Sequence, residues 1–498
     1  NQNGIYLESG SNTTISNNNL NNIQGNYGIY LGVGANTTIS DNVLNVIQGK
    51  GIRLGDGDNT QISDNVISNC SSQGIYADNS ENLIIKRNQI TYCSDYGIEL
   101  NYYNHYAIID SNAINNNDYG IYIDENNNDV SITNNHVLDN GNTYGIRVRY
   151  NNERISIETN SIADNGSYGV YIENNYNYQF NIRSNTIKDH SNRGIYMNYN
   201  SYGNIVDNLI VNNGDHGIYL YGVNYGDCEV RGNTINGHYY YGLYWYSNSW
   251  SQYTLTLVNN SITNNGSYGI YCDNGDYANT IKYNNSWNNS NGNYGGSLPS
   301  GTGNLTDINT NGTVSDVYYN ISENPNYIDP ENGDFTLQPS SPNIDAGDPS
   351  LTDLDGTVSD IGKFPFLQNV PIIQVVPNDY SLSFGEVAVN TSDTINVTLK
   401  NIGFDNLIID PFDIVGSGFL SNISDSVVIA ADSSFNLSII FSPTDSADYS
   451  GSFTLNNNST NNDVIEYTLE GSGFVPYGSI LLYSGNGSYD FGEIGRAH

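Results

Sequence analysis

One short pattern recurs about every 24 residues from residue 4 to residue 284. A glycine followed by an aliphatic residue returns in twelve copies at intervals of 23 to 27 residues: Gly4, Gly28, Gly51, Gly74, Gly97, Gly120, Gly145, Gly169, Gly194, Gly217, Gly242 and Gly269. In the same phase, an asparagine ends an aliphatic-x-x-Asn motif: Asn18, Asn42, Asn65, Asn88, Asn112, Asn135, Asn160, Asn185, Asn208, Asn233, Asn260 and Asn284. A fixed period of this length is typical of folds that stack similar units.

Each repeat contains three short segments in which apolar and polar residues alternate, separated by turns rich in Asn, Asp and Gly. Alternation with a period of two predicts strands. A unit this short cannot enclose a core alone, but it can form one turn of a coil whose strands pair with the next turn. The sequence therefore predicts a parallel β-helix of about twelve turns over residues 1–295. Asparagine suits one corner of each turn, because it tolerates left-handed backbone and can hydrogen-bond its own kind in the adjacent turn.

The alternation also predicts which residues face outward. In each glycine-containing segment the first and third residues after the glycine are apolar and are expected to face the core, as Ile121 and Ile123 are. The residue between them is expected to face outward, and it is usually tyrosine: Tyr6, Tyr30, Arg53, Tyr76, Glu99, Tyr122, Arg147, Tyr171, Tyr196, Tyr219, Tyr244 and Tyr271. We expect an external aromatic strip along the coil.

Charge and composition exclude several classes of function. Lys and Arg number 15 against 52 Asp and Glu, so the net charge is −37 and nucleic acid is a poor partner. No run of about 18 apolar residues is present, which argues against a membrane span. The four cysteines predict no disulfide scaffold. Cys70 and Cys93 occupy the same position in successive repeats. They could form a disulfide between turns or remain two free thiols, and the sequence does not decide between these alternatives.

The pattern changes after the repeats. Residues 296–370 are rich in aspartate toward their end and are expected to close the coil. Longer two-residue alternations begin after Pro371, as in Ile395–Leu399, and predict an antiparallel β-sandwich over residues 374–474. Residues 475–498 are expected to begin a truncated second copy, because Tyr489–Glu493 restarts the motif of Leu382–Glu386.

The repeats of residues 1–365 resemble the right-handed parallel β-helix proteins, which include pectate-lyase-like enzymes and the carbohydrate-binding and sugar-hydrolase repeat domains. Four motifs of the C-terminal part resemble immunoglobulin-like domains named for the abnormal-spindle, SPD and hydin proteins: Leu382–Glu386, Lys400–Gly403, Phe441–Pro443 and Leu469–Gly473. These resemblances imply an all-β fold. They also imply a secreted or cell-surface bacterial protein, monomeric, whose signal and anchor are not in this sequence and whose partner is a polysaccharide or cell-surface glycan.

The aromatic strip supplies candidate ligand-binding residues. An aromatic ring can stack on the apolar face of a sugar, and tyrosine adds a hydroxyl group. The candidates are Tyr122, Tyr171, Tyr196, Tyr219 and Tyr244. The alternative is a tyrosine ladder that only stabilises the coil, as in a non-catalytic stalk or adhesin.

Two groups of charged residues are candidates for catalysis by a polysaccharide lyase or a glycoside hydrolase. The first contains Asp124, Arg147, Arg149 and Glu173 in adjacent turns. A lyase needs a cation to neutralise a uronate carboxylate and a base to remove the neighbouring proton, and Arg149 or a tyrosine is a candidate base. The alternative is a ladder of surface ion pairs from Asp124 through Arg149 to Glu173.

The second group contains Arg193, Asp215 and His216, one strip over and next to the repeated glycines. Histidine can act as a base near neutral pH, and the alternative is a solvated turn. Gly214–Gly217 resembles the Gly-His-Gly motif of polygalacturonases, but the paired aspartates and the Arg-x-Lys element of that family are absent, as is the Asp-Pro-His-Glu motif of β-helix epimerases. Whether the chain is an enzyme stays open.

One candidate metal site lies in the aspartate-rich segment. Oxygen ligands at close spacing near Gly356 are typical of calcium sites, although the full EF-hand pattern is missing. The candidate ligands are Asp345, Asp348, Asp353, Asp355 and Asp360. The alternative is a hydrogen-bonded or solvated turn, and no other cofactor is predicted.

Overall fold

The computed structural model describes residues 3–174, 179–198, 202–222, 227–246, 254–273, 280–368 and 370–475. The chain forms two compact units, Asn1–Phe366 and Leu367–His498, and each is described by itself. Apart from residue 475, the predicted second sandwich copy at 475–498 lies outside the described residues.

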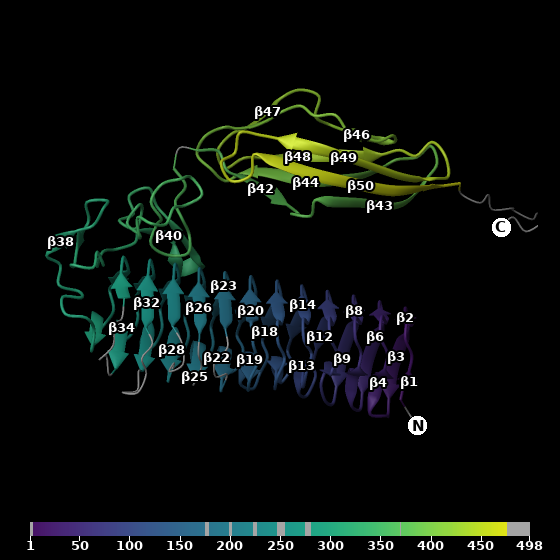
Figure 1. Ribbon diagram of the computed structural model, residues 1–498, viewed down its shortest axis with the longest axis horizontal. Coiled ribbons are helices and arrows are strands. Elements are labelled where there is room, and N and C mark those ends of the chain that lie inside the picture. The colour runs from purple at the N-terminus through teal and green to yellow at the C-terminus, as the bar shows by residue number, and fades with distance from the viewer. Residues whose placement is uncertain are drawn as a thin grey trace, which may run out of the picture. The chain divides into compact units, whose positions relative to one another are not determined.

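The first unit is a parallel β-helix, in which each turn adds one strand to each of three sheets (Figure 1). Sheet A contains β1 (Ile5–Ser9), β4 (Tyr27–Val33), β7 (Lys50–Asp56), β10 (Ile75–Asp78), β13 (Tyr96–Leu100), β16 (Tyr119–Ile123), β19 (Tyr144–Arg149), β22 (Tyr168–Glu173), β25 (Arg193–Asn198), β28 (Ile218–Tyr221), β31 (Leu243–Tyr246), β34 (Tyr268–Asp273) and β37 (Gly292–Gly296). Sheet B contains β2 (Thr14–Ser16), β5 (Thr38–Ser40), β8 (Gln61–Ser63), β11 (Ile84–Lys86), β14 (Ile108–Asp110), β17 (Ser131–Thr133), β20 (Ile155–Glu158), β23 (Phe180–Arg183), β26 (Gly203–Val206), β29 (Cys228–Arg231), β32 (Leu255–Val258) and β35 (Thr280–Lys282). Sheet C contains β3 (Asn19–Ile23), β6 (Val43–Ile47), β9 (Val66–Cys70), β12 (Gln89–Thr91), β15 (Ala113–Asn115), β18 (His136–Leu138), β21 (Ser161–Ala163), β24 (Thr186–Lys188), β27 (Leu209–Val211), β30 (Thr234–Asn236), β33 (Ser261–Thr263) and β36 (Asn285–Trp287).

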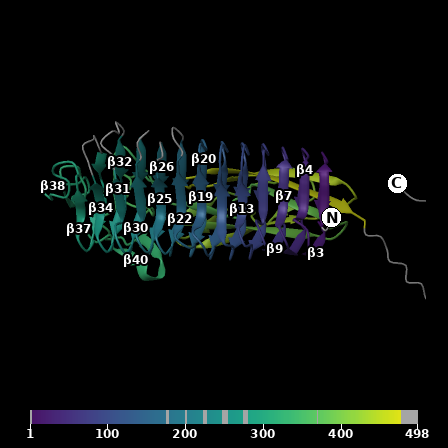
Figure 2. The same cartoon turned by 90° about the horizontal axis from the view of Figure 1, so that it is seen from below.

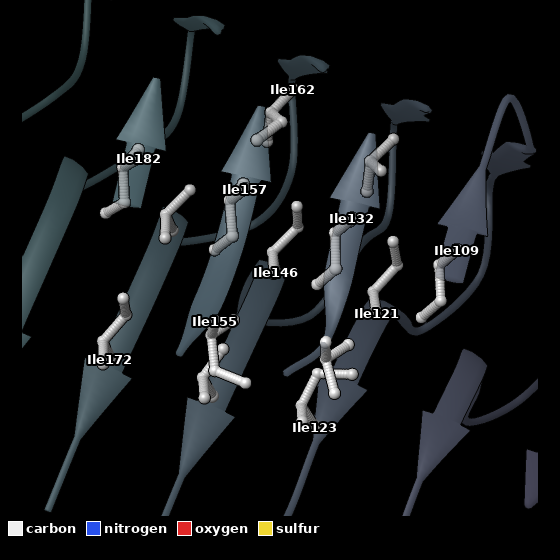
Figure 3. Close-up of a cluster of buried hydrophobic side chains, with 14 of the residues drawn as sticks. Ile109, Ile121, Ile123, Ile132, Ile146, Ile155, Ile157, Ile162, Ile172 and Ile182 are labelled. Carbon is white, nitrogen blue, oxygen red and sulfur yellow. The ribbon is translucent and has the colours of Figure 1, made fainter. Parts of the chain in front are cut away.

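The register places the same repeat position of every turn in one column. Ile121 pairs with Ile146, and the next residue, Tyr122, pairs with Arg147. The predicted inward residues are confirmed as the core, and Figure 3 shows isoleucines of successive turns facing one another between the strands. Each fully buried isoleucine contributes about 1.5–3 kcal/mol of hydrophobic stabilisation.

The repeated glycine is required by the close approach of neighbouring turns. A Cβ atom at Gly28 would lie 2.7 Å from both the Gly51 carbonyl oxygen and Leu44 Cδ2. No side chain fits at such distances without moving the backbone.

Stacked asparagine side chains form the corner between sheets B and C. Asn88 donates to Asn112 Oδ1 from its backbone N–H at 2.9 Å and from Nδ2 at 3.0 Å. Asn88 Nδ2 also donates to the Ile62 carbonyl oxygen at 2.9 Å, so each amide joins successive turns. The twelve predicted asparagines form this ladder, and Asn320 extends it by one position beyond Asn284.

The left-handed backbone of this corner lies one residue before the ladder asparagine, which corrects the predicted role of Asn. Arg87 has φ 52° and Ser111 has φ 55°, whereas Asn88 and Asn112 have no positive φ. The ladder residue directs both its backbone N–H and its amide at the next turn, and the chain turns the corner from sheet B to sheet C at the residue before it.

A second buried ladder lies between sheets C and A. Its members are Asn117, Asn140, Asn165, His190, Asn213, His238, Asn265 and Asn289. His190 takes an asparagine position and accepts a hydrogen bond from the Asn165 backbone N–H at 3.2 Å. Cys70 and Cys93 continue the same column. Both are buried free thiols, so of the two alternatives that the sequence left open, the structure has the free thiols and not the inter-turn disulfide.

The segment after the repeats differs in part from the predicted closing turns. Asp316 accepts the Asn320 backbone N–H at 3.0 Å and ends the first ladder. The segment also contains β38 (Asp307–Ile308), β39 (Val314–Ser315), β40 (Tyr327–Asp329), the 3-10 helix η1 (Pro330–Asn332) and β41 (Asp334–Leu337). Tyr327 and Phe335 pack against Leu209 and Val211, the apolar outward residues of β27, so this part of the segment covers the side of the coil.

The second unit confirms the predicted β-sandwich. Its strands are β42 (Ile373–Val376), β43 (Ser381–Ala388), β44 (Asp393–Asn401), β45 (Leu407–Ile409), β46 (Phe419–Ser421), β47 (Val427–Ile429), β48 (Ser434–Phe441), β49 (Asp448–Asn456) and β50 (Val464–Phe474). A sheet of β42, β44, β48 and β46 and a sheet of β43, β50 and β49 enclose a core that includes Val397, Leu437 and Tyr467. One pair, β43 with β50, is parallel where the sequence predicted antiparallel pairing throughout. No helix of the described residues is long and apolar enough to cross a membrane.

We expect the second ladder to make the coil sensitive to acid. Burial lowers the pKa of His190 from 6.5 to about 4, so the unfolded chain binds a proton that the folded chain resists. The contribution of His190 is therefore complete above about pH 6.5 and falls by roughly 3 kcal/mol as the pH drops to 4. His190→Asn restores the ladder residue. Its free energy of unfolding, measured by denaturant titration, should fall less between pH 7.5 and pH 4.5 than that of the wild type. His136→Asn on the exposed face of sheet C is the control, and an equal pH effect in both variants would contradict the prediction.

Candidate functional site

The outward face of sheet A carries two adjacent columns of mostly aromatic residues, and Figure 2 shows its strands side by side. The central column is the predicted strip from Tyr6 to Tyr271. The edge column contains the residue before each repeated glycine from Gly28 to Gly269: Tyr27, Lys50, Gln73, Tyr96, Tyr119, Tyr144, Tyr168, Arg193, His216, Tyr241 and Tyr268. Only Arg193 and His216 of the edge column were predicted as candidates, although the recurring Tyr-Gly pair in the sequence indicates its tyrosines.

The tyrosine rings stack on one another along the coil. The ring centroids of Tyr171 and Tyr196 are 4.8 Å apart with planes 10° apart, and those of Tyr219 and Tyr244 are 4.8 Å apart at 11°. The two columns also contact each other, as Tyr168 and Tyr171 do at 5.3 Å. The distance between hydrogen-bonded strands, about 4.8 Å, sets this spacing.

Two of the five predicted ligand-binding tyrosines are buried. Tyr122 is 4% exposed and Tyr171 is 8% exposed. Arg147 Cζ lies 5.4 Å from the Tyr122 ring and 5.7 Å from the Tyr171 ring, and it helps to cover both. Tyr196, Tyr219 and Tyr244 are half-buried, so the more open members of the five predicted tyrosines lie on β25, β28 and β31.

The first group of charged candidates is brought together as two ion pairs. Arg149 donates to both oxygens of Asp124, from Nε at 3.0 Å and from Nη2 at 3.1 Å. Arg147, and not Arg149 as predicted, pairs with Glu173, to which Arg147 Nε donates at 3.0 Å and the Tyr171 hydroxyl at 2.7 Å. The predicted ladder is split because Arg147 and Arg149 reach in opposite directions along the coil.

These pairs make Arg149 unsuitable as a base. Burial lowers the pKa of Arg149, but its hydrogen bonds to Asp124 outweigh that effect and the pKa is raised. For Tyr122, burial and the hydrogen bond to Asp124 both raise the pKa, so neither group releases a proton near neutral pH. The ion-pair alternative describes this patch better than a lyase base does.

The second group of candidates, Arg193, Asp215 and His216, also meets. Asp215 Oδ2 lies 2.8 Å from His216 Nδ1 and 3.3 Å from Arg193 Nε. Arg193 Cζ lies 4.0 Å from the Tyr219 ring centroid. His216 is 6% exposed, and its ring is within 5.2 Å of the Tyr241 ring.

The environment of this group sets its protonation. Burial lowers the pKa of His216 despite the neighbouring carboxylate. Burial raises the pKa of Asp215, but the contact with His216 and the charge of Arg193 outweigh it and the pKa is lowered. A neutral imidazole beside a carboxylate is similar to a base with its orienting group, but among the described residues His216 Nδ1 has no partner in hydrogen-bonding geometry, and aromatic rings surround the imidazole.

Two cavities lie over sheet B and include no member of the two columns. One of about 410 Å³ is lined by Glu153, Arg154, Gln179, Tyr202, Gly203, Asn204 and Asp227. The other, about 170 Å³, is lined by Glu158, Asn181, Arg183, Asn204, Val206, Glu229 and Arg231. They share Asn204, so they adjoin.

The aspartates of the candidate calcium site are only partly brought together. Asp360 accepts the backbone N–H groups of Asp345 at 2.7 Å and Phe366 at 2.6 Å, and Asp353 accepts that of Asp360 at 2.8 Å. Asp348 instead pairs with Lys282 at 2.5 Å. In the part of the chain that the structure describes, no group of three or more His, Cys, Asp or Glu side chains is arranged to hold a metal ion.

Comparisons with known proteins concern the coil. Residues 3–149 and 144–311 match the family described as Right handed beta helix region. No curated protein matches the sequence. The A-module of the Azotobacter vinelandii mannuronan C-5 epimerase AlgE4 is 15% identical, covering 58% of this chain and 91% of that one with a TM-score of 0.47. The periplasmic alginate epimerase AlgG is 13% identical, covering 54% and 77% with a TM-score of 0.35. The Dettilon tailspike protein is 15% identical, covering 86% of each chain with a TM-score of 0.36.

A double-mutant cycle tests the structural role of Arg149 and Asp124. Arg149→Gln and Asp124→Asn should each lower the free energy of unfolding, because each leaves a partly buried charge without its partner. The double variant should lose less than the two losses combined, with a coupling of about 0.5–3 kcal/mol in denaturant titrations. Additive losses would show that the pair does not stabilise the coil.

Calcium binding at the aspartate-rich segment stays a prediction. A cation bound only by the folded chain raises the melting temperature, so a chelator should lower it and added calcium should restore it. Asp353→Asn should remove that response. An unchanged melting temperature after chelation would contradict a structural calcium ion.

Proposed function

Since this chain belongs to the right-handed β-helix family, we propose that it is an extracellular or cell-surface protein that binds a polysaccharide on the outward face of sheet A. One observation carries this proposal. Half-buried tyrosines gather over β28, β31 and β34 and form a continuous surface, here named the aromatic platform: Tyr219, Tyr221, Tyr244, Tyr246 and Tyr271.

The stacking geometry determines how a sugar would meet the platform. The rings of Tyr221 and Tyr246 are 4.9 Å apart, and those of Tyr244 and Tyr271 are 5.8 Å apart at 4°. Ring faces therefore cover one another, and a ligand meets ring edges and hydroxyl groups. A row of hydroxyls suits the hydroxyl-rich edge of a glycan chain, since each can donate and accept a hydrogen bond.

The charge of the chain favours a neutral glycan. At a net charge of −37, the protein repels polyanions, including polymers of uronic acids. The cationic group nearest the platform does not offset this repulsion, because Arg193 already contacts Asp215.

We propose that the immunoglobulin-like unit serves as a spacer.

The second candidate function is a structural stalk. The burial of Tyr122 and Tyr171 and the face-to-face stacking favour it, because both stabilise the coil without any ligand. Offset or parallel aromatic contacts contribute about 0.5–1.5 kcal/mol each beyond the area that they bury.

A glycan array with the full chain distinguishes the two functions. We expect binding to one or more neutral glycans, and Tyr244→Ala should weaken it by about tenfold or more, because it removes the centre of the platform. Tyr106→Ala is the matched control, since Tyr106 is 55% exposed and lies outside the platform. A blank array for the wild type, or equal binding by the two variants, would contradict the proposal and leave the stalk.

A further inference from the structure

Two carboxyl groups meet on sheet A at a distance from the platform along the coil. Glu99 occupies the central column on β13, and Asp95 directly precedes that strand. The side-chain amide of Gln73 joins them, because its Nε2 donates to Asp95 Oδ2 at 2.9 Å and to Glu99 Oε2 at 2.6 Å. One amide group thus holds two acids side by side.

The orientation of Gln73 is determined by its other end. Gln73 Oε1 accepts hydrogen bonds from Lys50 Nζ at 2.6 Å and from Ser72 Oγ at 2.5 Å. Because the Lys50 ammonium and the Ser72 hydroxyl both donate to the Gln73 oxygen, the NH₂ group of Gln73 is the end that faces the two acids. Lys50 is itself held 4.1 Å from the centroid of the Tyr76 ring.

The two acids differ in their surroundings. Glu99 is 8% exposed, and burial raises its pKa to about 7, while Asp95 is more exposed and its pKa is also raised by burial. The residues described here offer Glu99 Oε2 one donor, the Gln73 amide, and offer Oε1 none. Besides burial and the Gln73 hydrogen bond, the charges of Asp95 and Asp124 raise the pKa of Glu99 and the charge of Lys50 lowers it.

We propose that Glu99 and Asp95 are the acid and the nucleophile of a retaining glycoside hydrolase site. Asp95 Oδ2 and Glu99 Oε2 both accept from Gln73 Nε2, at 2.9 Å and 2.6 Å, so these two oxygens are at most about 5.5 Å apart. This limit is compatible with retaining enzymes, whose carboxyl groups are about 5–5.5 Å apart, and it lies below the roughly 6.5–9.5 Å of inverting enzymes. The substrate class is a neutral polysaccharide, for the electrostatic reason given above. This inference rests on the proposed function, because the platform lies on the same face and would hold the chain that is cleaved.

The reaction balances with water as the only co-reactant. The Asp95 carboxylate attacks the anomeric carbon while Glu99 gives its proton to the glycosidic oxygen, so the bond between that carbon and oxygen breaks and the departing chain gains a hydroxyl group. Glu99, now a carboxylate, takes a proton from water. The water oxygen attacks the anomeric carbon, the bond to Asp95 breaks, and both acids return to their first state. Gln73 and Lys50 are positioning residues.

The first experiment measures new reducing ends when the full chain is incubated with each glycan that binds on the array. Glu99→Gln should lower the rate by about 10²–10⁴-fold, because the amide has no proton to give. Asp95→Asn should also abolish turnover. Glu81→Gln is the matched control, since Glu81 is exposed in a turn between sheets A and B. Unchanged melting temperatures in these variants, which keep the volume of each side chain, exclude a loss of fold.

The second experiment reads the pH profile and the stereochemistry. The wild-type rate should fall as the pH rises above about 7, where Glu99 loses its proton. Gln73→Leu should move this limb to higher pH, because the Gln73 hydrogen bond lowers the pKa of Glu99. Proton NMR of the first product should show retained anomeric configuration.

Each outcome separates this inference from the proposed function. Binding without cleavage overturns the hydrolase site and leaves the glycan-binding proposal intact. Cleavage that is unchanged in Glu99→Gln, or a product of inverted configuration, overturns the assigned roles. A chain that neither binds nor cleaves any glycan overturns both.

Discussion

Amide hydrogen bonds between successive turns are the interaction on which the rest of this structure depends. Each ladder carbonyl, such as Asn112 Oδ1, accepts two N–H groups from the turn before it, and the donor amide also reaches a backbone carbonyl. Because these bonds are buried, they fix how the strands of each turn align with the strands of the next turn. A slip of one residue would leave buried amides without partners and would turn every strand inside out. The ladder therefore determines the columns of the outer face.

Stacking in columns brings charged residues of the same kind close together, because the same repeat position of successive turns recurs about every 4.8 Å along the coil. Like charges at that spacing repel strongly when water is partly excluded. Tyrosine avoids the problem and gains stacking, and the arginines of β19 avoid it by pairing with acids of the neighbouring turns. Asp95 and Glu99 are two acids held together by one amide, and their raised pKa values reflect this environment, with burial as the main cause.

The sequence was sufficient for the coil and its core because periodicity determines the direction of each Cβ atom. Ile121 and Ile123 could be placed inside, and the asparagine ladder could be predicted, from position alone. Periodicity does not determine where a long side chain goes after Cβ. It therefore could not show that Arg147 pairs with Glu173, or that Tyr122 is covered. Leu209 and Val211 carried a signal that was overlooked, since apolar residues at outward positions require a covering segment.

The same reasoning indicates where function lies in a repeat of this kind. Tyrosine suffices in the outer columns wherever stability alone matters, so the positions that depart from tyrosine are informative. Lys50 and Gln73 depart from it in the edge column, and Glu99 departs from it in the central column. These three positions lie on consecutive turns and meet through two hydrogen bonds of one amide side chain. Arg53, Arg147, Arg193 and His216 also depart from tyrosine in these columns, but each lies beside an acid: Arg53 beside Asp78, Arg147 beside Glu173, and Arg193 and His216 beside Asp215. Glu99 keeps one oxygen without a donor among the described residues, and an acid in that state is equipped to act on a ligand.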